Sequence, residues 1–362
     1  MILSFLVNGH IESTYSKTTA QWTPLRFVSD PHVRIHGMYP AINYGQQAAE
    51  GLKAYRGPHD SSVTIFRPDF NARRMQHSAD VASMPHVPVA MFLKACRSAV
   101  ALNAAFLPPH NSGAALYLWP QLYGSSAHLS LGAPDCYTFC VFAIPTGTVH
   151  GILPVKALIV DDSDRMAPNG SGRAKPGGNY APVLRWSDQA RREGFGITLH
   201  LNSAKHEEVD GFSTCALIAI KAETVDFVTV IVPDSKCIIE SITSDSILQI
   251  ARSFGWKTQK RPITYVELPD FTEILAAGTA ASLVPVRSIT RRQKLRLLPH
   301  SARVSVNSDS ETIMYMPESQ EEAGPVCSRL LTQLKAIQQG RVKDEFGWNF
   351  VVTEEDTKID GA

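Results

Sequence analysis

The sequence has almost no excess charge and no long apolar run, and each absence excludes a class of protein. Its 35 basic and 34 acidic residues give a formal net charge of +1, whereas nucleic-acid binders use an excess of Lys and Arg against phosphates. No apolar run approaches the ~20 residues that span a bilayer. The opening residues 1–7 lack a basic start and a cleavage site, so we expect no signal peptide and no membrane partner.

Cysteine is also scarce, with six residues scattered over a chain of 362. This number and spacing do not suit a disulfide framework, and most of the cysteines lie in apolar runs, so we expect reduced, buried thiols in a cytoplasmic protein. Cys136 and Cys140 share one face of a strand. A zinc site there would need further ligands, and the twelve histidines do not cluster beside these cysteines, so we expect no metal site.

What the sequence does contain is an unusual lysine segment, GSGRAKPGGNY, at residues 170–180. Glycines on both sides of Lys175 allow close approach of the backbone, and Pro176 breaks regular structure directly after it. Such a lysine suits phosphate binding or a Schiff base with an aldehyde. A nucleotide P-loop needs Gly before the lysine and Ser or Thr after it, so the neighbours Ala174 and Pro176 exclude that motif. Schiff-base chemistry and an incidental surface lysine remain as alternatives.

The hydrophobic pattern predicts an α+β protein of two domains. We place a smaller N-terminal domain at residues 1–145, a linker at 146–153, and a larger C-terminal domain at 154–362, with a cleft between them as the ligand site. The predicted strands are residues 62–66, 116–122, 137–144, 155–160, 196–201, 215–220 and 227–232. The predicted helices are residues 69–83, 89–102, 243–254 and 324–340. We also predict a first hairpin turning at Asn8-Gly9, and the alternation in 196–201 predicts a half-buried strand.

Four residues elsewhere suit a cofactor that carries an aldehyde and a phosphate. Thr243 opens a predicted helix, whose N-terminus is a ready phosphate site. Thr279 lies in a turn of small residues, Arg74 can bind phosphate in bidentate fashion, and Glu208 lies between strands. Each of these residues alone has a purely structural explanation, so their order along the chain matters more than any one of them.

Together, these stretches resemble the branched-chain aminotransferases of the fold-type IV pyridoxal-phosphate enzymes, and most closely the eukaryotic, fungal-type members. The resemblance covers nearly the whole chain. It rests on NYGQQAAEGLKAYRG (43–57), FRPDFNARRMQHSA (66–79), the lysine segment with GGNYAPVLRWSDQARREG (177–194), EEVDGFST (207–214), SITSDSI (241–247) and AAGTAASLVPVRSI (276–289).

The resemblance implies a homodimer and a set of roles. Lys175 would form the Schiff base with pyridoxal 5'-phosphate and then move the proton, Glu208 would pair with the ring nitrogen, and Tyr180 with the phenolic oxygen. The implied phosphate contacts are Arg74, Ile242, Thr243 and Thr279. The implied substrate contacts are Tyr44, from the dimer-related wall, and Ala49, Tyr117, Trp119, Thr279 and Ala280.

This chain departs from the family pattern at positions that would contact the substrate. Trp119 replaces an arginine that binds the side-chain carboxylate of glutamate, a contact worth roughly 1.5–3 kcal/mol, although Arg173 could substitute for it. Ala49 replaces a phenylalanine and leaves room for longer or aromatic side chains. A further departure is Ser244, in place of an arginine. Ser213 stands at an asparagine position of the family, as expected of a fungal-type member.

The resemblance therefore implies transamination between an L-amino acid and an apolar 2-oxo acid, branched-chain or bulkier, as a specialised chemistry of the kind that secondary metabolism uses. One alternative is another enzyme of the same fold type: an (R)-amine transaminase, a D-amino acid transaminase or a lyase. A second alternative is a catalytically silent copy, which the presence of Lys175, Tyr180 and Glu208 disfavours.

Overall fold

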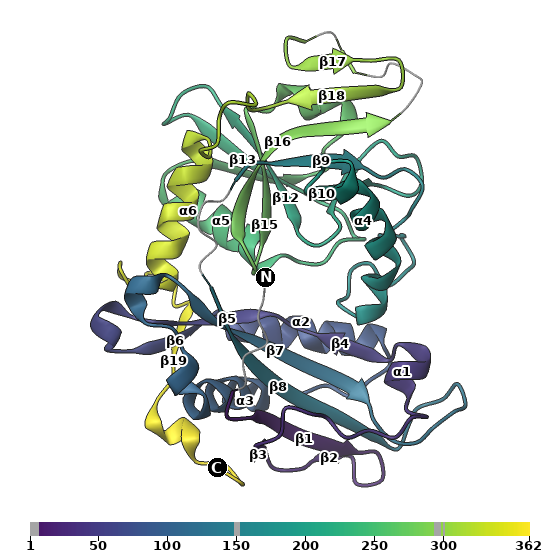
Figure 1. The fold of residues 1–362 in the computed structure, drawn as a ribbon, viewed down its shortest axis with the longest axis vertical. Coiled ribbons are helices and arrows are strands. Elements are labelled where there is room, and N and C mark those ends of the chain that lie inside the picture. Colours follow the sequence, from purple (N-terminus) through teal and green to yellow (C-terminus); the bar gives the residue numbers. More distant parts are fainter. Residues whose placement is uncertain (1–6, 148–152, 293–297, 300) are drawn as a thin grey trace. The chain divides into compact units, whose positions relative to one another are not determined.

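The chain folds into two units that each carry a sheet (Figure 1). The structure is a computed structural model, and it describes residues 7–147, 153–292, 298–299 and 301–362. Unit 1 comprises Met1–Val149, Ala174–Gly178 and Lys335–Ala362, and unit 2 comprises His150–Arg173 and Asn179–Leu334. Helices and sheets are mixed in both units, as expected of an α+β protein. The predicted hairpin at Asn8-Gly9 cannot be followed, because its first strand lies outside the described residues.

The unit boundaries differ from the expected domains in two places. The C-terminal residues from Lys335 onward and the short lysine segment Ala174–Gly178 group with unit 1, whereas the sequence analysis assigned both to one continuous C-terminal domain. The physical reason is main-chain hydrogen bonding. Strand β19 (Asn349–Val351) pairs with β6 (Val63–Phe66), and the main chain of Lys175 bonds to Ser78 and Ala49.

The sheet of unit 1 is antiparallel at every pairing in the described residues, with the order β19-β6-β5-β7-β8-β1-β2. Strand β3 pairs with β1, and β4 pairs with β7. The remaining strands of this sheet are β1 (His10–Ser16), β2 (Gln21–Trp22), β3 (Arg26–Val28), β4 (Gln47–Ala49), β5 (Leu52–Arg56), β7 (Ala115–Gly124) and β8 (Cys136–Thr146). The long central strands β7 and β8 bury residues on both of their faces.

The helices of unit 1 follow sequence signals. Helix α1 spans Pro40–Tyr44, α2 spans Pro68–Val81 and α3 spans Val89–Leu102. Helix α2 begins with proline in its first turn, where the missing N–H removes no intrahelical bond. Helix α3 packs against α2 and against β1, β7 and β8 (Figure 1). Its buried residues Phe92, Ala95, Cys96, Ala99 and Val100 recur every three to four positions, the spacing of one helix face.

The sheet of unit 2 is mixed, with the order β11-β10-β9-β16-β15-β12-β13-β14. Strand β9 is parallel to β10 and β16, and β13 is parallel to β14, while β17 and β18 extend the sheet from β16. These strands are β9 (Val155–Ile159), β10 (Ile197–Leu201), β11 (Val209–Phe212), β12 (Ala216–Ala222), β13 (Val228–Pro233), β14 (Lys257–Arg261), β15 (Glu273–Gly278), β16 (Ser282–Arg292), β17 (Val304–Val306) and β18 (Ser310–Met314).

Three helices accompany this sheet in the described part of the chain: α4 (Leu184–Arg192), α5 (Ile242–Ser253) and α6 (Pro325–Gln338). Helix α5 packs against β12, β13, β14 and β15. Helix α6 begins in unit 2 and ends in unit 1 as the units are divided. Within the described residues, every helix is too short or too polar to cross a membrane. All six cysteines are unpaired, three of them buried and three partly so.

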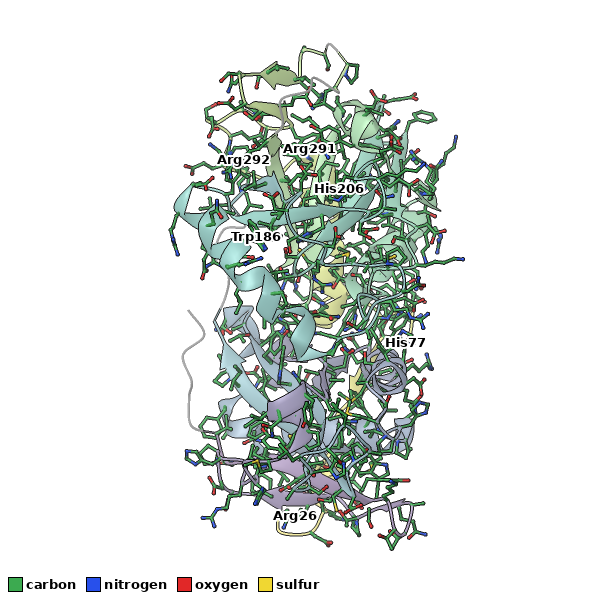
Figure 2. All side chains as sticks on the ribbon, turned by 90° about the vertical axis from the view of Figure 1, so that its right-hand side faces the viewer. Arg26, His77, Trp186, His206, Arg291 and Arg292 are labelled. Carbon is green, nitrogen blue, oxygen red and sulfur yellow. The ribbon has the colours of Figure 1, made fainter. Side chains whose placement is uncertain are left out.

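The loop that follows β9 is anchored by an ionic contact. Arg291 donates from Nε and Nη2 to the two carboxylate oxygens of Asp161 at 2.9 and 2.8 Å, and His206 Nδ1 lies 3.0 Å from Asp161 Oδ1. Figure 2 labels both of these partners, Arg291 and His206. These hydrogen bonds and the two nearby positive charges hold the pKa of Asp161 below its usual value against the opposing effect of burial. The start of this loop is therefore fixed to β16.

The strand at Ile197–Leu201 corrects one expectation. Alternation predicted a half-buried strand with Thr198 and His200 toward solvent, yet both of these residues are buried. The reason is that both side chains hydrogen-bond to the Ser213 hydroxyl, at 2.5 Å from Thr198 Oγ1 and 2.7 Å from His200 Nε2. A polar side chain with a buried partner can occupy a position that alternation alone assigns to the surface.

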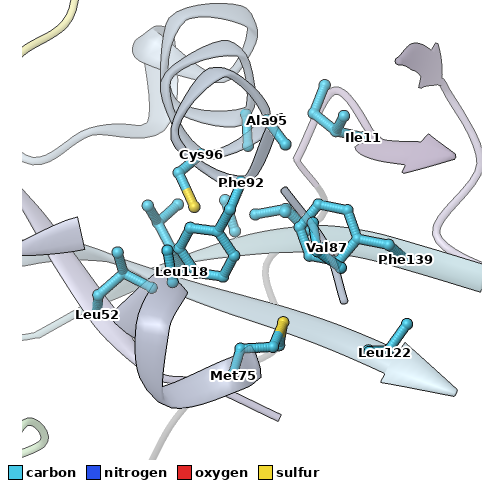
Figure 3. Packing of buried hydrophobic residues seen from close by; sticks show 14 of the residues in the cluster. Ile11, Leu52, Met75, Val87, Phe92, Ala95, Cys96, Leu118, Leu122 and Phe139 are labelled. Carbon is cyan, nitrogen blue, oxygen red and sulfur yellow. The ribbon is translucent and has the colours of Figure 1, made fainter. Parts of the chain in front are cut away.

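The core of unit 1 yields a stability prediction. Phe92 on α3 is fully buried, stacks on Phe139 with ring centroids 5.8 Å apart, and lies beside Met75 and Leu118 (Figure 3). Replacing Phe92 with Ala should destabilise unit 1 by about 3–5 kcal/mol, because it leaves a cavity. Thermal unfolding measures this loss. Phe227→Ala, at a side chain that is 72% exposed, is the control and should change stability by less than about 0.5 kcal/mol. Equal effects would contradict the assigned core.

Candidate functional site

The lysine segment enters a tight turn whose two ends are tied together. Ser171 Oγ donates to Asn179 Oδ1 at 2.6 Å, and Asn179 Nδ2 donates back to the Ser171 carbonyl at 2.7 Å. A Cβ at Gly172 would lie 2.6 Å from the Cys237 carbonyl oxygen, so only glycine fits there. After Pro176, short 3-10 turns at Gly177–Asn179 and Ala181–Val183 lead into α4. The helical pattern expected from Ala181 thus begins as a 3-10 turn.

The main chain of Lys175 is fixed on both sides within unit 1. Its amide donates to Ser78 Oγ of α2 at 3.0 Å, and its carbonyl accepts from the Ala49 amide of β4 at 3.1 Å. Beside it, a Cβ at Gly177 would fall 1.6 Å from Gln47 Nε2, so a side chain there would displace Gln47. The backbone that carries the Lys175 amine is therefore held by two secondary-structure elements.

Two aromatic residues of β7 accompany this lysine. Lys175 Nζ lies 5.2 Å from the ring centroid of Trp119, within cation–π range. The rings of Tyr117 and Trp119 lie 5.9 Å apart, since residues two apart on a strand share a face. Trp119 is 37% exposed, which is high for a large aromatic residue beside a buried strand. Ala49, whose amide is hydrogen-bonded to the Lys175 carbonyl, is buried and presents only a methyl group.

Arg74 lies on α2, one turn before Ser78, whose hydroxyl donates to the Arg74 carbonyl at 3.0 Å. The guanidinium donates from Nε to Glu50 Oε1 at 2.7 Å and from Nη2 to Glu50 Oε2 at 2.5 Å. Glu50 is fully buried and also accepts from Asn71 Nδ2 at 2.8 Å. A guanidinium has five N–H groups, so this bidentate pair orients Arg74 while engaging only part of its donor set.

Tyr44, the remaining candidate in unit 1, ends α1. Its hydroxyl donates to the Leu129 carbonyl, and its side chain is exposed. The structure therefore places Lys175, Ala49, Trp119 and Tyr117 in one group, links Arg74 to that group through Ser78, and gives Tyr44 a contact with the loop after β7.

In unit 2, Tyr180 follows the lysine segment and lies against Arg165, with the guanidinium carbon 5.1 Å from the ring centroid. Glu208 immediately precedes β11 and forms an isolated bridge with Thr264. Its main chain is held by Asn202, which donates to the Glu208 carbonyl at 2.7 Å and accepts from its amide at 3.2 Å. The Glu208 side chain itself is exposed, so its backbone is fixed and its carboxylate reaches outward.

The remaining phosphate candidates, besides Arg74, occupy two chain turns in unit 2. Ser241 is the N-cap of α5, because its hydroxyl accepts from the Ser244 amide at 3.1 Å. Ile242 and Thr243 occupy the first turn, where backbone amides and the helix dipole attract an anion. Thr279 and Ala280 form the turn between β15 and β16, and β15 packs against α5.

Sequence reasoning missed three residues near these candidates. Glu50 holds Arg74, Arg165 lies against Tyr180, and His200 is buried on β10, which pairs with β11. Glu50 carried one signal, since it belongs to a matched segment, but a buried carboxylate cannot be told from a surface one by composition. Arg165 and His200 lie outside the matched segments and carried no signal.

Comparisons with known proteins show that this chain is similar to aminotransferases. The family model described as amino-transferase class IV matches residues 47–289. Aminotransferase poxL of Penicillium oxalicum is 46% identical over 348 residues, which cover 96% of this chain and 90% of that protein. The branched-chain amino acid aminotransferase gloG of Glarea lozoyensis is 43% identical over 353 residues, covering 96% and 93%.

Solved structures show the same fold at lower identity. The branched-chain amino acid aminotransferase of Escherichia coli matches with a TM-score of 0.72 at 22% identity, covering 91% of this chain and 97% of that chain. The branched-chain amino acid aminotransferase of Thermobaculum terrenum, solved in its PLP-form, matches with a TM-score of 0.72 at 19% identity, covering 96% and 100%. The expected α+β fold of two sheets is thereby confirmed.

The pair of Glu50 and Arg74 yields a prediction. Glu50→Gln should destabilise the protein by about 3–5 kcal/mol, since a guanidinium with 11% of its side chain exposed would lose its carboxylate. Thermal unfolding measures the loss. The matched control is Glu12→Gln, whose partner Arg26 is 60% exposed, and it should cost at most about 1 kcal/mol. If both variants unfold at the wild-type temperature, Glu50 does not hold Arg74.

Proposed function

The chain belongs to the class IV aminotransferases, and from this premise we propose that it transfers an amino group between an L-amino acid and an apolar 2-oxo acid with pyridoxal 5'-phosphate as cofactor. The observation that carries the proposal is Lys175, an amine on a backbone fixed by Ser78 and Ala49. The fungal relatives at 43–46% identity support the same reaction, and specialised metabolism is the setting that we propose for it.

The donor set of this chain fits the cofactor. Lysine supplies an amine for the aldehyde, the first turn of α5 supplies amides for a phosphate, and Arg74 supplies a guanidinium oriented by Glu50. Arg165 Nη1 is buried and has no hydrogen-bond partner among the residues that the structure describes. A buried donor of this kind is expected where an acceptor binds.

The proposed roles divide between holding the cofactor and moving a proton. When bound, pyridoxal phosphate supplies the electron sink that makes the α-proton of the substrate labile. Lys175 Nζ would accept that proton and later return it to complete the transfer. Glu208 would accept a hydrogen bond from the protonated ring nitrogen, and Tyr180 would donate one to the phenolic oxygen. We assign the phosphate to Arg74, Ile242, Thr243 and Thr279, and the substrate carboxylate to Thr279, Ala280 and Tyr117.

The substrate side chain is proposed to contact Trp119 and Ala49. Trp119 offers an exposed indole face beside Lys175, and an indole cannot pair with the second carboxylate of glutamate as a guanidinium would. Ala49 leaves room for a longer or aromatic side chain. Apolar substrates therefore suit this surface better than acidic ones.

We also propose a homodimer, supported by an exposed apolar surface on unit 1. Two segments meet there, since the His128 amide donates to the Met38 carbonyl at 3.1 Å and Tyr44 donates to Leu129. The exposed apolar residues of this surface are Ile35, Met38, Ile42, Tyr44, Leu129 and Leu131. An apolar patch of this kind marks an interface, and a second copy would place Tyr44 at it. A monomer mass in sedimentation equilibrium would contradict the dimer.

The role of Lys175 yields the first functional prediction. Borohydride reduction of the protein with pyridoxal phosphate should add one phosphopyridoxyl group at Lys175, and Lys175→Ala should abolish that adduct and lower kcat by about 10²–10⁴-fold or more. Peptide mass spectrometry locates the adduct.

The control residue is Lys53, another lysine of unit 1, whose side chain is buried. Burial lowers the pKa of Lys53 to about 7, so above that pH much of its amine is neutral and nucleophilic. Lys53→Met should keep the adduct at Lys175. An adduct at Lys53 in the wild-type protein, or none at all, would contradict the proposed function.

Trp119 yields the second functional prediction. Trp119→Arg should raise kcat/KM for glutamate roughly 10- to 100-fold, because a charged hydrogen bond contributes about 1.5–3 kcal/mol, and it should lower kcat/KM for aromatic and long apolar amino acids. The control Trp119→Phe keeps an aromatic face and should keep the wild-type preference. Steady-state kinetics with a panel of amino donors and 2-oxo acids gives both values. A wild-type enzyme that already prefers glutamate would defeat the assignment.

A further inference from the structure

The segment from Asp161 to Arg165, which links β9 to the lysine turn, is tethered at three alternating residues of unit 2. Asp161 is bound by Arg291 and His206. The Ser163 carbonyl lies 3.2 Å from His200 Nδ1. Arg165 Nε donates to the Ser213 carbonyl at 2.8 Å. A loop tied at every second residue holds its last side chain, that of Arg165, in one place.

His200 has a single arrangement of protons in this network. Its side chain is buried, and burial lowers its pKa to about 4, with Arg165 lowering it further and Asp164 opposing the shift. The ring is therefore neutral at physiological pH. Because the Ser163 carbonyl can only accept, Nδ1 carries the hydrogen and Nε2 is the acceptor. The Ser213 hydroxyl then donates to Nε2 at 2.7 Å, and Thr198 Oγ1 donates to Ser213 Oγ at 2.5 Å.

Ser213 is consequently held by its main chain and its side chain together. Its amide donates to the Thr198 carbonyl at 3.0 Å, its hydroxyl connects Thr198 to His200, and its carbonyl accepts from Arg165. In the sequence, Ser213 stands at an asparagine position of the family, where a serine is expected of a fungal-type member. The hydrogen bond of the Ser213 hydroxyl to His200, on the neighbouring strand β10, fixes the direction of the Ser213 carbonyl that accepts from Arg165.

Arg165 connects this hydrogen-bonded network to Tyr180. Its guanidinium carbon lies 5.1 Å from the phenol ring centroid. Burial lowers the pKa of the Arg165 guanidinium, and the electrostatic interaction and side-chain hydrogen bond with Tyr180 oppose that shift. Arg165 Nη1 is buried and has no hydrogen-bond partner in the described ranges. The cation thus lies against the face of the phenol ring, and a cation close to a phenol strengthens it as a hydrogen-bond donor.

We propose that His200 and Ser213 are positioning residues that hold Arg165 against Tyr180, and that they thereby set how strongly Tyr180 binds the phenolic oxygen of the cofactor. This inference rests on the proposed function, in which Tyr180 meets that oxygen. It assigns a task to two buried residues to which the proposed function gives no contact with substrate or cofactor.

The test uses the cofactor-loaded protein and two measurements besides activity. These are the dissociation constant for pyridoxal phosphate and the pH midpoint of the visible absorbance band of the bound cofactor. His200→Phe removes both ring contacts and should raise the dissociation constant about tenfold. It should also move the midpoint to higher pH, because a nearby cation favours the deprotonated form and the variant displaces that cation.

Milder variants separate the two tethers and keep the test independent of a folding failure. An asparagine amide can occupy the place of Nδ1 and a glutamine amide that of Nε2, so His200→Asn should keep the Ser163 contact and His200→Gln the Ser213 contact. Each should shift the midpoint less than His200→Phe does. Ser213→Ala, which retains the backbone carbonyl, should also give an intermediate shift.

Two comparisons decide the inference. His10 on β1 of unit 1 is also buried, hydrogen-bonded to a carbonyl at 2.9 Å and lowered in pKa by burial, so His10→Phe is the matched control. It should lower the unfolding temperature and leave the absorbance midpoint unchanged. In a Tyr180→Phe background, His200→Phe should give no further shift of the midpoint, because its effect passes through the phenol.

The outcomes distinguish a failure of this inference from a failure of the proposed function on which it rests. Wild-type protein that does not bind pyridoxal phosphate overturns the proposed function and this inference with it. Wild-type protein that binds the cofactor, with His200→Phe unchanged in both measurements, overturns the inference alone. An equal midpoint shift in His10→Phe would also overturn the inference alone. The same holds if His200→Phe shifts the midpoint further in the Tyr180→Phe background.

Discussion

The two main-chain hydrogen bonds of Lys175, to Ser78 and from Ala49, are the constraint on which the proposed chemistry depends. A flexible lysine can reach many positions, and catalysis needs its amine in one of them. Fixing the backbone removes the main source of that freedom and leaves only the side-chain torsions. The glycines around the lysine serve the same end, because at Gly177 and Gly172 a side chain would meet Gln47 or the Cys237 carbonyl.

The proposed substrate contacts and the proposed partners of the cofactor ring lie in different parts of the chain. Ala49 and Trp119, the two departures for which we propose contact with the substrate, lie on β4 and β7, which pair directly in the sheet of unit 1. The proposed partners of the cofactor ring, Tyr180 and Glu208, lie in unit 2. Under the proposed roles, substitutions on β4 and β7 would change which substrate side chain is accepted and leave Tyr180 and Glu208 unchanged.

Much of the fold could be predicted from the sequence, since its signals are local. The spacing of apolar residues gave helix α3 with the same bounds as in the structure, and the apolar runs gave β7 and β8 to within a few residues. What could not be predicted depends on contacts between distant residues. Burial of His200 requires Ser213 on another strand, and the carboxylate of Glu50 becomes a structural group only when α2 brings Arg74 to it. The resemblance pointed to Lys175, Tyr180 and Glu208, whose roles remain predictions for the experiments described.

The pairing of β19 with β6 has a consequence for biosynthesis. Strand β19 comes from residues 349–351, whereas the rest of its sheet is encoded before residue 150. As the chain leaves the ribosome, every strand of the second sheet emerges before the first sheet can be completed. The edge of β6 therefore stays open through most of translation, and an open edge can pair with other chains. The first sheet, whose strands are mostly made first, is therefore exposed to aggregation at its β6 edge until β19 has been synthesised.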